Sequence, residues 1–488
     1  MKLKLKTLRI GAGRPVIVSA ECVAERLNVR INDRLLVAHK GSKIIATVDI
    51  ARGMLKNNEL SLSEEVVKFL KIHSGDLVDV SLSLEPRSIR LIQKKLKGAE
   101  LTKEEILQII IDIVSNALSE AEIAYFVSGV YEKGMTLKET IALTDAVYRT
   151  GVTLKWKKKP IVDKHSIGGL AGNRTTPIVV SICAAAGVIM PKTSSRAITS
   201  AAGTADVVET LAQVDISAKE LQHIVKKVGA CLAWGGSLGL APADDKLIRV
   251  ERLLNLDPES QLIASILAKK LSVGSTHVLL DIPFGPEAKV TLAEGLALKQ
   301  KFLKVASHFK LKLKVILTRG IEPIGNGIGP VLEMNDIIRV LKQENSPKDL
   351  EEKCLFVAGE LLEFSGKSKK GKGRTLAKSI LLSGRAFKKF KEIIEAQHGK
   401  VHYLKPASNS YIFRSNKSGK IKKINNKLIN YLGRVLGTPG DKSSGIYLHN
   451  HIGAVITKDE PLLTIYAESK KKLKEAKHFI KENGIISF

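Results

Sequence analysis

A glycine-rich segment of the sequence carries side chains that are suited to binding an anion. Residues 163–177 place Lys164, His165 and Ser166 before three glycines, and the segment ends on Thr-Thr-Pro. Glycines let backbone amides approach an anion, and the N-terminus of a following helix adds positive partial charge. The segment therefore predicts a phosphate site with Lys164, Ser166 and a threonine as donors. It lacks the Gly-Lys-Ser/Thr ending of a Walker A loop and does not indicate Mg-dependent nucleotide hydrolysis. Glycines before a helix also serve plain tight turns.

A second segment, residues 193–206, gathers hydroxyl side chains and one guanidinium, Arg196, among small residues. Such a cluster offers many donors to an anion with little bulk. The alternative is structural: the Ser and Thr residues would cap a helix, and Asp206 would form an ion pair with Arg196. Both interpretations follow from the residue types.

A third group of candidates lies between residues 241 and 270. Asp257 precedes Pro258, which is the usual arrangement of an N-cap followed by proline at the first helical position. Asp257 could equally act as a catalytic acid. In the helix predicted after it, Ser265 and Lys269 are four residues apart and share one face, so both could reach one ligand.

The composition indicates a globular protein of several domains. The chain has 488 residues, of which 44% are apolar and 26% are charged, and a single core rarely organises more than roughly 200 residues. Its net charge is +29, and residues 366–488 alone carry 27 Lys and Arg against eight Asp and Glu. A positive field suits nucleic acid, acidic membranes or phosphorylated metabolites. The lysine-rich run 367–374 contains no aromatic residue for base stacking, so we interpret it as a solvated loop or helix start.

The remaining composition signals concern location. The four cysteines, Cys22, Cys183, Cys231 and Cys354, are too widely spaced for a C-x-x-C motif and are interpreted as free thiols. The first residues alternate Lys and Leu and do not form a signal peptide, and no uncharged stretch is long enough to span a membrane. We therefore expect a cytoplasmic protein.

Periodicity divides the chain into segments of different character. Residues 1–85 contain short β-branched runs separated by turns and predict a small barrel-like module. Charged and turn residues at 86–100 suggest a linker. Capping boxes at Thr102 and Thr136 then open helices within residues 101–155.

The rest of the chain predicts an α/β core followed by an α+β domain. Strands are expected at 187–190, 277–282 and 314–318, and helices at 292–308 and 332–343, which suggests a sheet covered by helices. After residue 401 short β runs return at 418–424, 445–449, 453–456 and 461–467, and a lysine-rich helix begins near Ser469.

Five motifs in this order resemble those of thymidine phosphorylases. They are Lys164-His165-Ser166-x-Gly168-Gly169, the segment from Ser195-Arg196 to Gly203-Thr204, Ala241-Pro242-Ala243-Asp244, Ser265-Ile266-Leu267-Ala268-Lys269-Lys270, and Ala396-Gln397-His398-Gly399. Their order and spacing extend the resemblance over residues 97–488. The additional N-terminal module and the form Ser195-Arg196-Ala197-Ile198-Thr199-Ser200 resemble the long branch of the family, which includes archaeal AMP phosphorylases.

The resemblance implies a multidomain α/β fold. It comprises a small β-rich N-terminal module (1–85), a discontinuous helical domain (97–160 plus 240–272), an α/β phosphate-binding domain with a central sheet (161–239 plus 273–400) and a C-terminal α+β domain (401–488). It also implies a homodimer or larger homo-oligomer in which the helical and α/β domains close on the substrate.

The activity implied by the resemblance is phosphorolysis. Phosphate attacks C1′ of a nucleoside, and the products are the free base and a pentose 1-phosphate. Thymidine or a related nucleoside is the first expectation, and AMP or another nucleoside 5′-monophosphate, giving ribose 1,5-bisphosphate, is the alternative. Inorganic phosphate is a co-substrate, and neither a cofactor nor a metal is expected.

The resemblance also implies roles for individual residues. Asp257 is expected to protonate the base, and His165 to lie near it. The expected phosphate-binding residues are Lys164, Ser166, Ser195 and Thr204. The expected substrate-binding residues are Gly169, Arg196, Ala197, Ile198, Thr199, Ser200, Ser265, Lys269 and Lys289.

The sequence departs from the pyrimidine-specific pattern at one place. Pyrimidine-specific members hold the base carbonyls with a Tyr and an Arg downstream of Ala-Pro-Ala-Asp, and here Ile248 and Glu251 fall near those two places. Two other functions are alternatives to phosphorolysis. One is nucleic-acid binding through the basic C-terminal quarter, and the other is glycosyl transfer to an amine-bearing acceptor.

Overall fold

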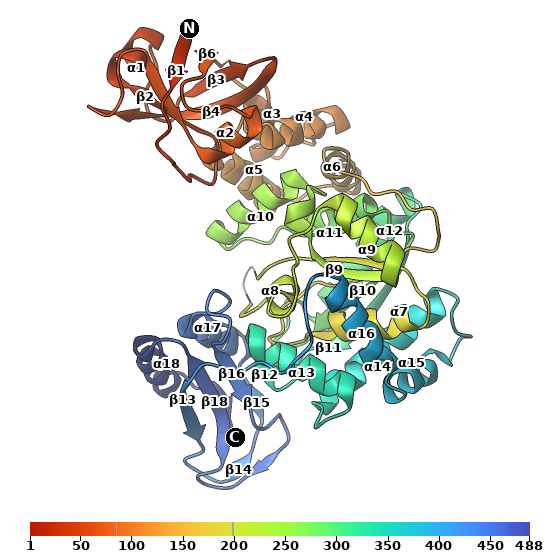
Figure 1. The fold of residues 1–488 in the computed structure, drawn as a ribbon. Coiled ribbons are helices and arrows are strands. Elements are labelled where there is room, and N and C mark those ends of the chain that lie inside the picture. Colours follow the sequence, from red (N-terminus) through yellow and green to blue (C-terminus); the bar gives the residue numbers. More distant parts are fainter. Residues whose placement is uncertain (84, 198–199) are drawn as a thin grey trace. The chain divides into compact units, whose positions relative to one another are not determined.

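A computed structural model describes residues 1–83, 85–197 and 200–488 of the chain. The chain forms two compact units: unit 1 contains residues 1–151 and 241–265, and unit 2 contains residues 152–240 and 266–488. The multidomain α/β fold class predicted from the sequence is confirmed (Figure 1).

The N-terminal part of unit 1 is a closed barrel with strand order β1-β5-β2-β4-β3-β6. Its core is built from alternating strand residues such as Leu35, Val37 and Val48, which are fully buried. The elements are β1 (Lys2–Leu5), β2 (Val16–Ala20), α1 (Glu21–Leu27), β3 (Arg34–His39), β4 (Ser42–Ala51), β5 (Glu59–Leu62), α2 (Glu64–Leu70) and β6 (Leu77–Leu82).

The rest of unit 1 is helical and is assembled from two stretches of chain. Both predicted capping boxes are present, at Thr102 and Thr136. The helices are α3 (Ser88–Leu96), α4 (Lys103–Val114), α5 (Glu120–Lys133), α6 (Leu137–Arg149), α10 (Pro242–Leu254) and the first part of α11 (Glu259–Val273).

The linker predicted at 86–100 is wrong, because α3 occupies most of it. The many charged residues of this stretch suggested a linker, but they belong to an amphipathic helix in which Ile92 and Lys95 are buried. Lys95 donates to the Oε1 of Glu139 at 2.8 Å, and the backbone N–H groups of Leu101 and Thr136 donate to the same carboxylate. Burial opposes ionisation of Glu139, but these bonds outweigh it and hold its pKa below the ordinary value. This carboxylate joins three segments of the helical domain.

Unit 2 is built on parallel strands. β10 (His277–Phe284) pairs with β7 (Val162–Ser166) on one side and with β11 (Lys312–Arg319) on the other. β8 (Met190–Ser194) pairs with β9 (Ala230–Trp234), and a parallel bridge between Ile161 and Ile189 joins β7 to β8. The carboxyl ends of all five strands therefore lie along one edge.

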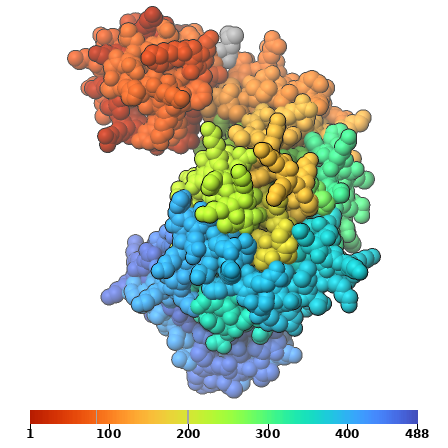
Figure 2. Space-filling view, turned by 45° about the vertical axis from the view of Figure 1, so that its right-hand side comes forward, coloured from red at the N-terminus to blue at the C-terminus, as the bar shows by residue number. Residues whose placement is uncertain are grey.

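Helices cover this sheet and bury a continuous apolar core. Every residue of α7 from Thr175 to Ala184 is buried. Figure 1 shows α7, α14, α15 and α16 gathered together, and residues 350–400 form one continuous surface in Figure 2. The helices are α7 (Thr175–Ala185), α8 (Thr204–Val208), α9 (Ala218–Val228), the 3-10 turn η1 (Gly235–Leu238), α12 (Leu292–His308), α13 (Pro330–Lys342), α14 (Lys348–Phe364), α15 (Gly373–Leu382) and α16 (Arg385–Ala396).

The C-terminal part of unit 2 is an α+β layer. Its main sheet has the order β12-β16-β18-β13, and β12 (Gly327–Ile328) comes from the preceding α/β segment. The other elements are β13 (Asn409–Arg414), β14 (Gly419–Lys420), β15 (Lys423–Ile424), α17 (Asn426–Leu436), β16 (Gly445–Leu448), β17 (Val455–Ile456), β18 (Pro461–Ala467), α18 (Lys470–Glu482) and β19 (Ile486–Ser487). The periodicity did not predict α17.

Two further sequence expectations can be compared with the fold. All four cysteines are free, as predicted. Among the described residues, no helix combines the length and apolarity needed to cross a membrane.

The buried pair of Lys95 and Glu139 generates the first prediction. Their side chains are 3% and 1% exposed, so Glu139→Ala leaves an uncompensated buried ammonium. We expect a loss of about 3–5 kcal/mol in the free energy of unfolding at neutral pH. Because the folded-state pKa of Glu139 is depressed, its contribution fades as pH falls through that pKa, and the difference from wild type should shrink in acid.

Urea denaturation at several pH values measures this effect. Lys68→Gln is the control, because it removes an exposed pair with Glu64 and should change stability by no more than about 0.5 kcal/mol. A loss of similar size in both variants would contradict the assignment of Glu139 as the anchor.

Candidate active site

The candidate phosphate residues lie at the carboxyl edge of the parallel sheet, where β7 runs into the glycine-rich segment. Ligands of open α/β sheets bind at this edge. In the register of β7 with β10, Lys164 lies opposite Leu279 and Ser166 lies opposite Asp281. Lys164, Ser166 and Asp281 therefore share one face of the sheet, whereas Asp163 and His165 point to the other.

Lys164 is buried and directed at the start of α7. Its Nζ donates to the Oγ1 of Thr175 at 2.7 Å and lies 3.5 Å from the Oγ1 of Thr176. Burial lowers the pKa of Lys164 to about 8, although the negative charge of Asp281 opposes this. The structure thus brings together the lysine and both threonines that the sequence offered as anion donors.

Asp281, which lies on the same face of the sheet as Lys164, forms a buried ion pair. The Nζ of Lys353, on α14, lies 3.2 Å from the Oδ2 of Asp281. The Oγ1 of Thr318 donates to the Oδ1 of the same carboxylate at 2.6 Å. Neither Lys353 nor Asp281 falls in a recognisable motif, so the sequence did not predict either residue as part of the site.

The opposite face carries a buried cluster of Asp163, Lys192 and Lys270. The Oδ2 of Asp163 accepts from Lys270 at 2.7 Å, and its Oδ1 lies 3.4 Å from the Nζ of Lys192. Burial lowers the pKa of Lys270 to about 7 despite the attraction of Asp163. Burial opposes ionisation of Asp163, yet the two lysines hold its pKa below the ordinary value. Two ammonium groups thus surround one carboxylate.

His165 extends from the same face of β7 as Asp163. Burial and the positive charges of Lys270, Lys192 and Lys269 lower its pKa well below the ordinary value. The imidazole is therefore neutral at physiological pH, and it can donate a hydrogen bond from one ring nitrogen and accept at the other.

In the second segment the structure bears out the ion pair offered as the structural alternative. Arg196 donates to both carboxylate oxygens of Glu209, at 2.6 and 2.8 Å, and to Asp206 at 3.2 Å, and it lies over the ring of Trp234. These bonds to Arg196 lower the pKa of Glu209 to about 2. The guanidinium is thus engaged within the protein.

Asp206 closes the loop that this segment forms. Its Oδ2 accepts from the backbone N–H groups of Ala197 and Gly203, at 2.7 and 2.8 Å. A Cβ at Gly203 would lie 2.4 Å from the carbonyl carbon of Arg196, so only glycine allows this closure. Ser195 is exposed, and the Oγ of Ser200 donates to the carbonyl of Ala202. Ile198 and Thr199, also predicted to bind substrate, lie outside the described residues.

A hydrogen bond between Arg174 and Thr204 connects the glycine-rich segment (163–177) to the second segment (193–206). The guanidinium of Arg174 donates to the Oγ1 of Thr204 at 3.1 Å and to the carbonyl of Ala202 at 2.8 Å, and its Nε donates to Glu333 at 2.5 Å. Arg174 lies inside the glycine-rich segment, but the motif did not predict a role for it. Glu333 lies outside every motif, and no local pattern in the sequence predicted a role for it.

Gly169 and Lys289, both predicted to bind substrate, are in contact. Gly169 has φ +98°, and a Cβ there would lie 2.9 Å from the Cγ of Lys289. The side chain of Asn426 donates to the carbonyl of Gly169 and accepts from the N–H of Ala171 at 2.7 Å. The glycine-rich turn is therefore fixed from the C-terminal part of the chain.

The other predicted residues are distributed along α11 and the stretch before it. Asp257 is exposed and, like Ser265, belongs to unit 1, whereas Lys269 belongs to unit 2. Ser265 and Lys269 lie one turn apart on α11, as predicted. The catalytic role of Asp257 stays a prediction.

The motif at residues 396–399 has a structural use. The side chain of Gln397 is fully buried, donates to the carbonyls of Gln213 and Leu232, and accepts from the N–H of Leu232 at 2.7 Å. A Cβ at Gly399 would lie 2.1 Å from the carbonyl oxygen of Leu211. The motif holds α16 against β9.

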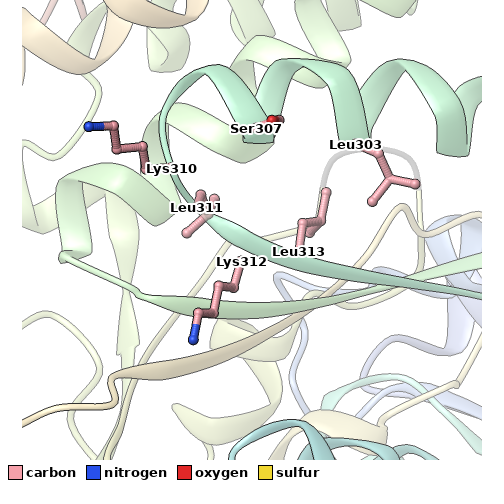
Figure 3. A pocket seen from close by; sticks show the side chains of 6 residues that line it. All are labelled: Leu303, Ser307, Lys310, Leu311, Lys312 and Leu313. Carbon is pink, nitrogen blue, oxygen red and sulfur yellow. The ribbon is translucent and has the colours of Figure 1, made fainter.

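A surface hollow of about 340 Å³ lies away from these residues. As Figure 3 shows, it is lined by residues of α12, of the following turn and of the first part of β11: Leu303, Ser307, Lys310, Leu311, Lys312 and Leu313. It lies at the amino end of β11, opposite to the edge that carries Lys164 and Ser166, and is not part of the candidate site.

Comparison with known proteins places these features in a family. Family models match residues 89–151 (glycosyl transferase family, helical bundle domain), 158–281 (glycosyl transferase family, a/b domain) and 420–487 (pyrimidine nucleoside phosphorylase C-terminal domain). The solved structure of anthranilate phosphoribosyltransferase from Thermus thermophilus matches with a TM-score of 0.53 and 19% identity. The match covers 63% of this chain and 99% of that chain, and it shows a shared fold.

Full-length relatives are much more similar. AMP phosphorylase of Thermofilum pendens is 42% identical over 99% of this chain and 94% of its own length, and AMP phosphorylase of Pyrococcus furiosus is 41% identical over 98% and 95%. A Legionella pneumophila (strain Paris) protein named "Putative thymidine phosphorylase" is 41% identical over 99% and 95%. This chain therefore belongs to the thymidine phosphorylase family of glycosyl transferases, as its motifs predicted, and is a phosphorylase of the pentosyltransferase class.

Proposed function

We propose that the enzyme cleaves nucleoside 5′-monophosphates, AMP foremost, with inorganic phosphate, giving ribose 1,5-bisphosphate and the free base. The similarity to AMP phosphorylases, which covers at least 98% of the chain and so includes the N-terminal barrel, carries this proposal. The sequence also supports it, because Ile248 and Glu251 replace the Tyr and Arg that hold a pyrimidine in the resembled enzymes.

Thymidine phosphorolysis, giving 2-deoxyribose 1-phosphate, is the second candidate. The name of the Legionella relative supports it at nearly the same identity. The replaced pyrimidine clamp weighs against it, because an aliphatic side chain and a carboxylate cannot donate to the base carbonyls.

The buried charges around β7 support phosphate as the attacking group. Lys164, Lys192, Lys270 and Lys353 are all largely buried, and the carboxylates beside them are Asp163 and Asp281. Lysines outnumber carboxylates in this group, and buried charge is costly unless it is paired. An anionic ligand on the side of Lys164 would restore the balance. We assign phosphate binding to Lys164, Ser166, Ser195 and Thr204.

The reaction needs a nucleophile, a positioned sugar and an acid. A phosphate oxygen donates its electron pair to C1′, the C1′–N bond breaks, and its electrons leave with the base. A proton from Asp257 neutralises a ring nitrogen of the base. Holding phosphate in fixed donors beside C1′ supplies much of the rate through proximity.

The remaining expectations are part of the proposal. Neutral His165, with Ser265 and Lys269, would contact base or sugar, and Gly169, Ala197, Ser200 and Lys289 would contact the nucleotide. Lys289, which lies against Gly169 of the glycine-rich turn, is the proposed cation for the 5′-phosphate. Phosphate acts as co-substrate, and we propose a cytoplasmic homodimer or larger homo-oligomer.

A base-release assay distinguishes the two candidate substrates. We expect phosphate-dependent base release from AMP, and at lower rates from CMP or UMP, because each carries the 5′-phosphate that Lys289 would bind. Chromatography with and without phosphate measures the products from AMP, CMP, UMP, thymidine and uridine. Release from free nucleosides only would refute the nucleotide assignment.

Removal of the Lys164 ammonium should disable the reaction. A charged hydrogen bond contributes about 1.5–3 kcal/mol, so Lys164→Ala should lower kcat/KM for phosphate by about 10- to 150-fold. In wild type, phosphate KM should rise as pH increases through about 8, because Lys164 then loses its proton. Exposed Lys372→Ala is the control. Normal phosphate affinity in Lys164→Ala would contradict the assignment of Lys164 to the phosphate site.

Replacement of Asp257 tests the proposed acid. Asp257→Asn should lower kcat by about 10²–10⁴-fold, the range for loss of general-acid catalysis, and change the Kd of AMP much less. Steady-state kinetics and calorimetric binding of AMP give both values. If binding weakened and kcat did not, Asp257 would be a binding or capping residue instead.

A further inference from the structure

The guanidinium of Arg174 lies between a buried glutamate and the proposed phosphate ligand Thr204. Its Nε donates to the Oε2 of Glu333 at 2.5 Å, and its Nη1 and Nη2 donate to the Oγ1 of Thr204 and the carbonyl of Ala202. Arg174 is 12% exposed and Glu333 is 1% exposed. The other oxygen of Glu333 accepts from the N–H of Gly329 at 3.0 Å. Both ends of the guanidinium are therefore fixed.

This arrangement sets the direction of the Thr204 hydroxyl proton. A hydroxyl has one proton to donate and two lone pairs to accept with. Because Arg174 donates to the Oγ1 of Thr204, it occupies a lone pair and leaves the proton for another acceptor. Thr204 is also the first residue of α8 and follows the loop closed by Asp206. The hydroxyl of Thr204 is thus oriented to donate its proton to another acceptor.

The ion pair also joins the two candidate anion-binding segments. Arg174 belongs to the glycine-rich segment, Ala202 and Thr204 belong to the hydroxyl-rich loop, and Glu333 lies on α13 among apolar core residues. Replacing a buried ion pair with well-packed apolar side chains often leaves the free energy of unfolding unchanged or raises it, so stability alone does not explain this pair. Burial raises the pKa of Glu333 to about 7 against the attraction of Arg174, so Arg174 favours its ionised form. The pair therefore links a core helix to the loop that carries Thr204.

We propose that Arg174 and Glu333 are positioning residues for phosphorolysis: Glu333 holds the guanidinium of Arg174, which fixes the Thr204 hydroxyl as a donor to the attacking phosphate. This inference rests on the proposed function. It concerns residues that act through Thr204 and do not themselves touch phosphate.

Two conservative variants test the positioning role. Glu333→Gln keeps the size of the side chain but loses the charge that orients Arg174, and Arg174→Lys keeps the charge but loses the planar fork. In each we expect the KM of phosphate and the Kd of inorganic phosphate to rise about tenfold, with a smaller change in the Kd of AMP. Steady-state kinetics and calorimetry on the full chain give these values.

Asp336→Asn is the matched control. Asp336 is also buried on α13 and binds the backbone N–H groups of Asn326 and Gly327, whereas its guanidinium partner is Arg339 and not Arg174. This variant should lower the melting temperature without changing the Kd of phosphate. A similar rise in the Kd of phosphate would mean that any damage to α13 suffices, and would overturn the inference.

A double-variant comparison separates positioning from general destabilisation. Thr204→Val removes the hydroxyl through which the pair is proposed to act, so adding Glu333→Gln to it should weaken phosphate binding no further. If Glu333→Gln melts below the assay temperature, Arg174→Lys in the Thr204→Val background gives the same test. A full additional tenfold loss would overturn the inference.

The wild-type enzyme separates this inference from the proposed function. If wild type releases base from AMP and the variants keep normal phosphate affinity, the positioning role is wrong and the function stands. If wild type binds phosphate and the variants weaken binding, but no base is released from AMP, the positioning role stands and the substrate is wrong. If wild type does not bind inorganic phosphate, both are wrong.

Discussion

The buried charge on both faces of β7 is the constraint on which the candidate site depends. Lys164 and Asp163 are adjacent and fully or nearly fully buried, so strand alternation sends one charge to each face of the sheet. Asp163 is neutralised within the fold by Lys192 and Lys270, whereas Lys164 donates to the hydroxyls of Thr175 and Thr176. A buried ammonium bonded to neutral hydroxyls is a position at which a bound anion gains most. The same strand thereby supplies a structural ion pair on one face and a proposed ligand site on the other.

The loops around Lys164 are held by bonds that leave donors available. Asp206 binds two amides of the hydroxyl-rich loop, Glu209 binds Arg196, and Arg174 binds Thr204. Fixing a loop in its binding conformation reduces the entropy lost when a ligand binds. The carboxylates of Asp206 and Glu209 therefore accept from backbone amides and from the guanidinium of Arg196, and they do not occupy the donors proposed for phosphate. This explains how carboxylates can lie in a site proposed for an anion.

The sequence predicted the parts of the structure that depend on short-range patterns. The capping boxes at Thr102 and Thr136 and the grouping of Lys164 with Thr175 follow from spacing within one segment, and they are present. The pairs of Asp163 with Lys270 and of Arg174 with Glu333 join residues 107 and 159 positions apart, and no local pattern predicts such partners. The error at 86–100 has the same origin. Lys95 counted as a linker residue only because its buried partner Glu139 lies in another helix.

The basic C-terminal quarter has a structural use that its composition does not suggest. Lys442 lies 2.9 Å from Glu209, which in turn binds Arg196, and Lys423 lies 3.0 Å from Glu287, which accepts from the N–H of Asn426. Asn426 binds the glycine-rich turn at Gly169 and Ala171, and the Oδ1 of Asn430 accepts from the N–H of Ala201. One face of α17 thus fixes both segments proposed to bind the substrate, and two lysines of the quarter compensate the acids beside them. Part of the positive charge of this quarter therefore serves the loops of the candidate site and is more than solvated surface.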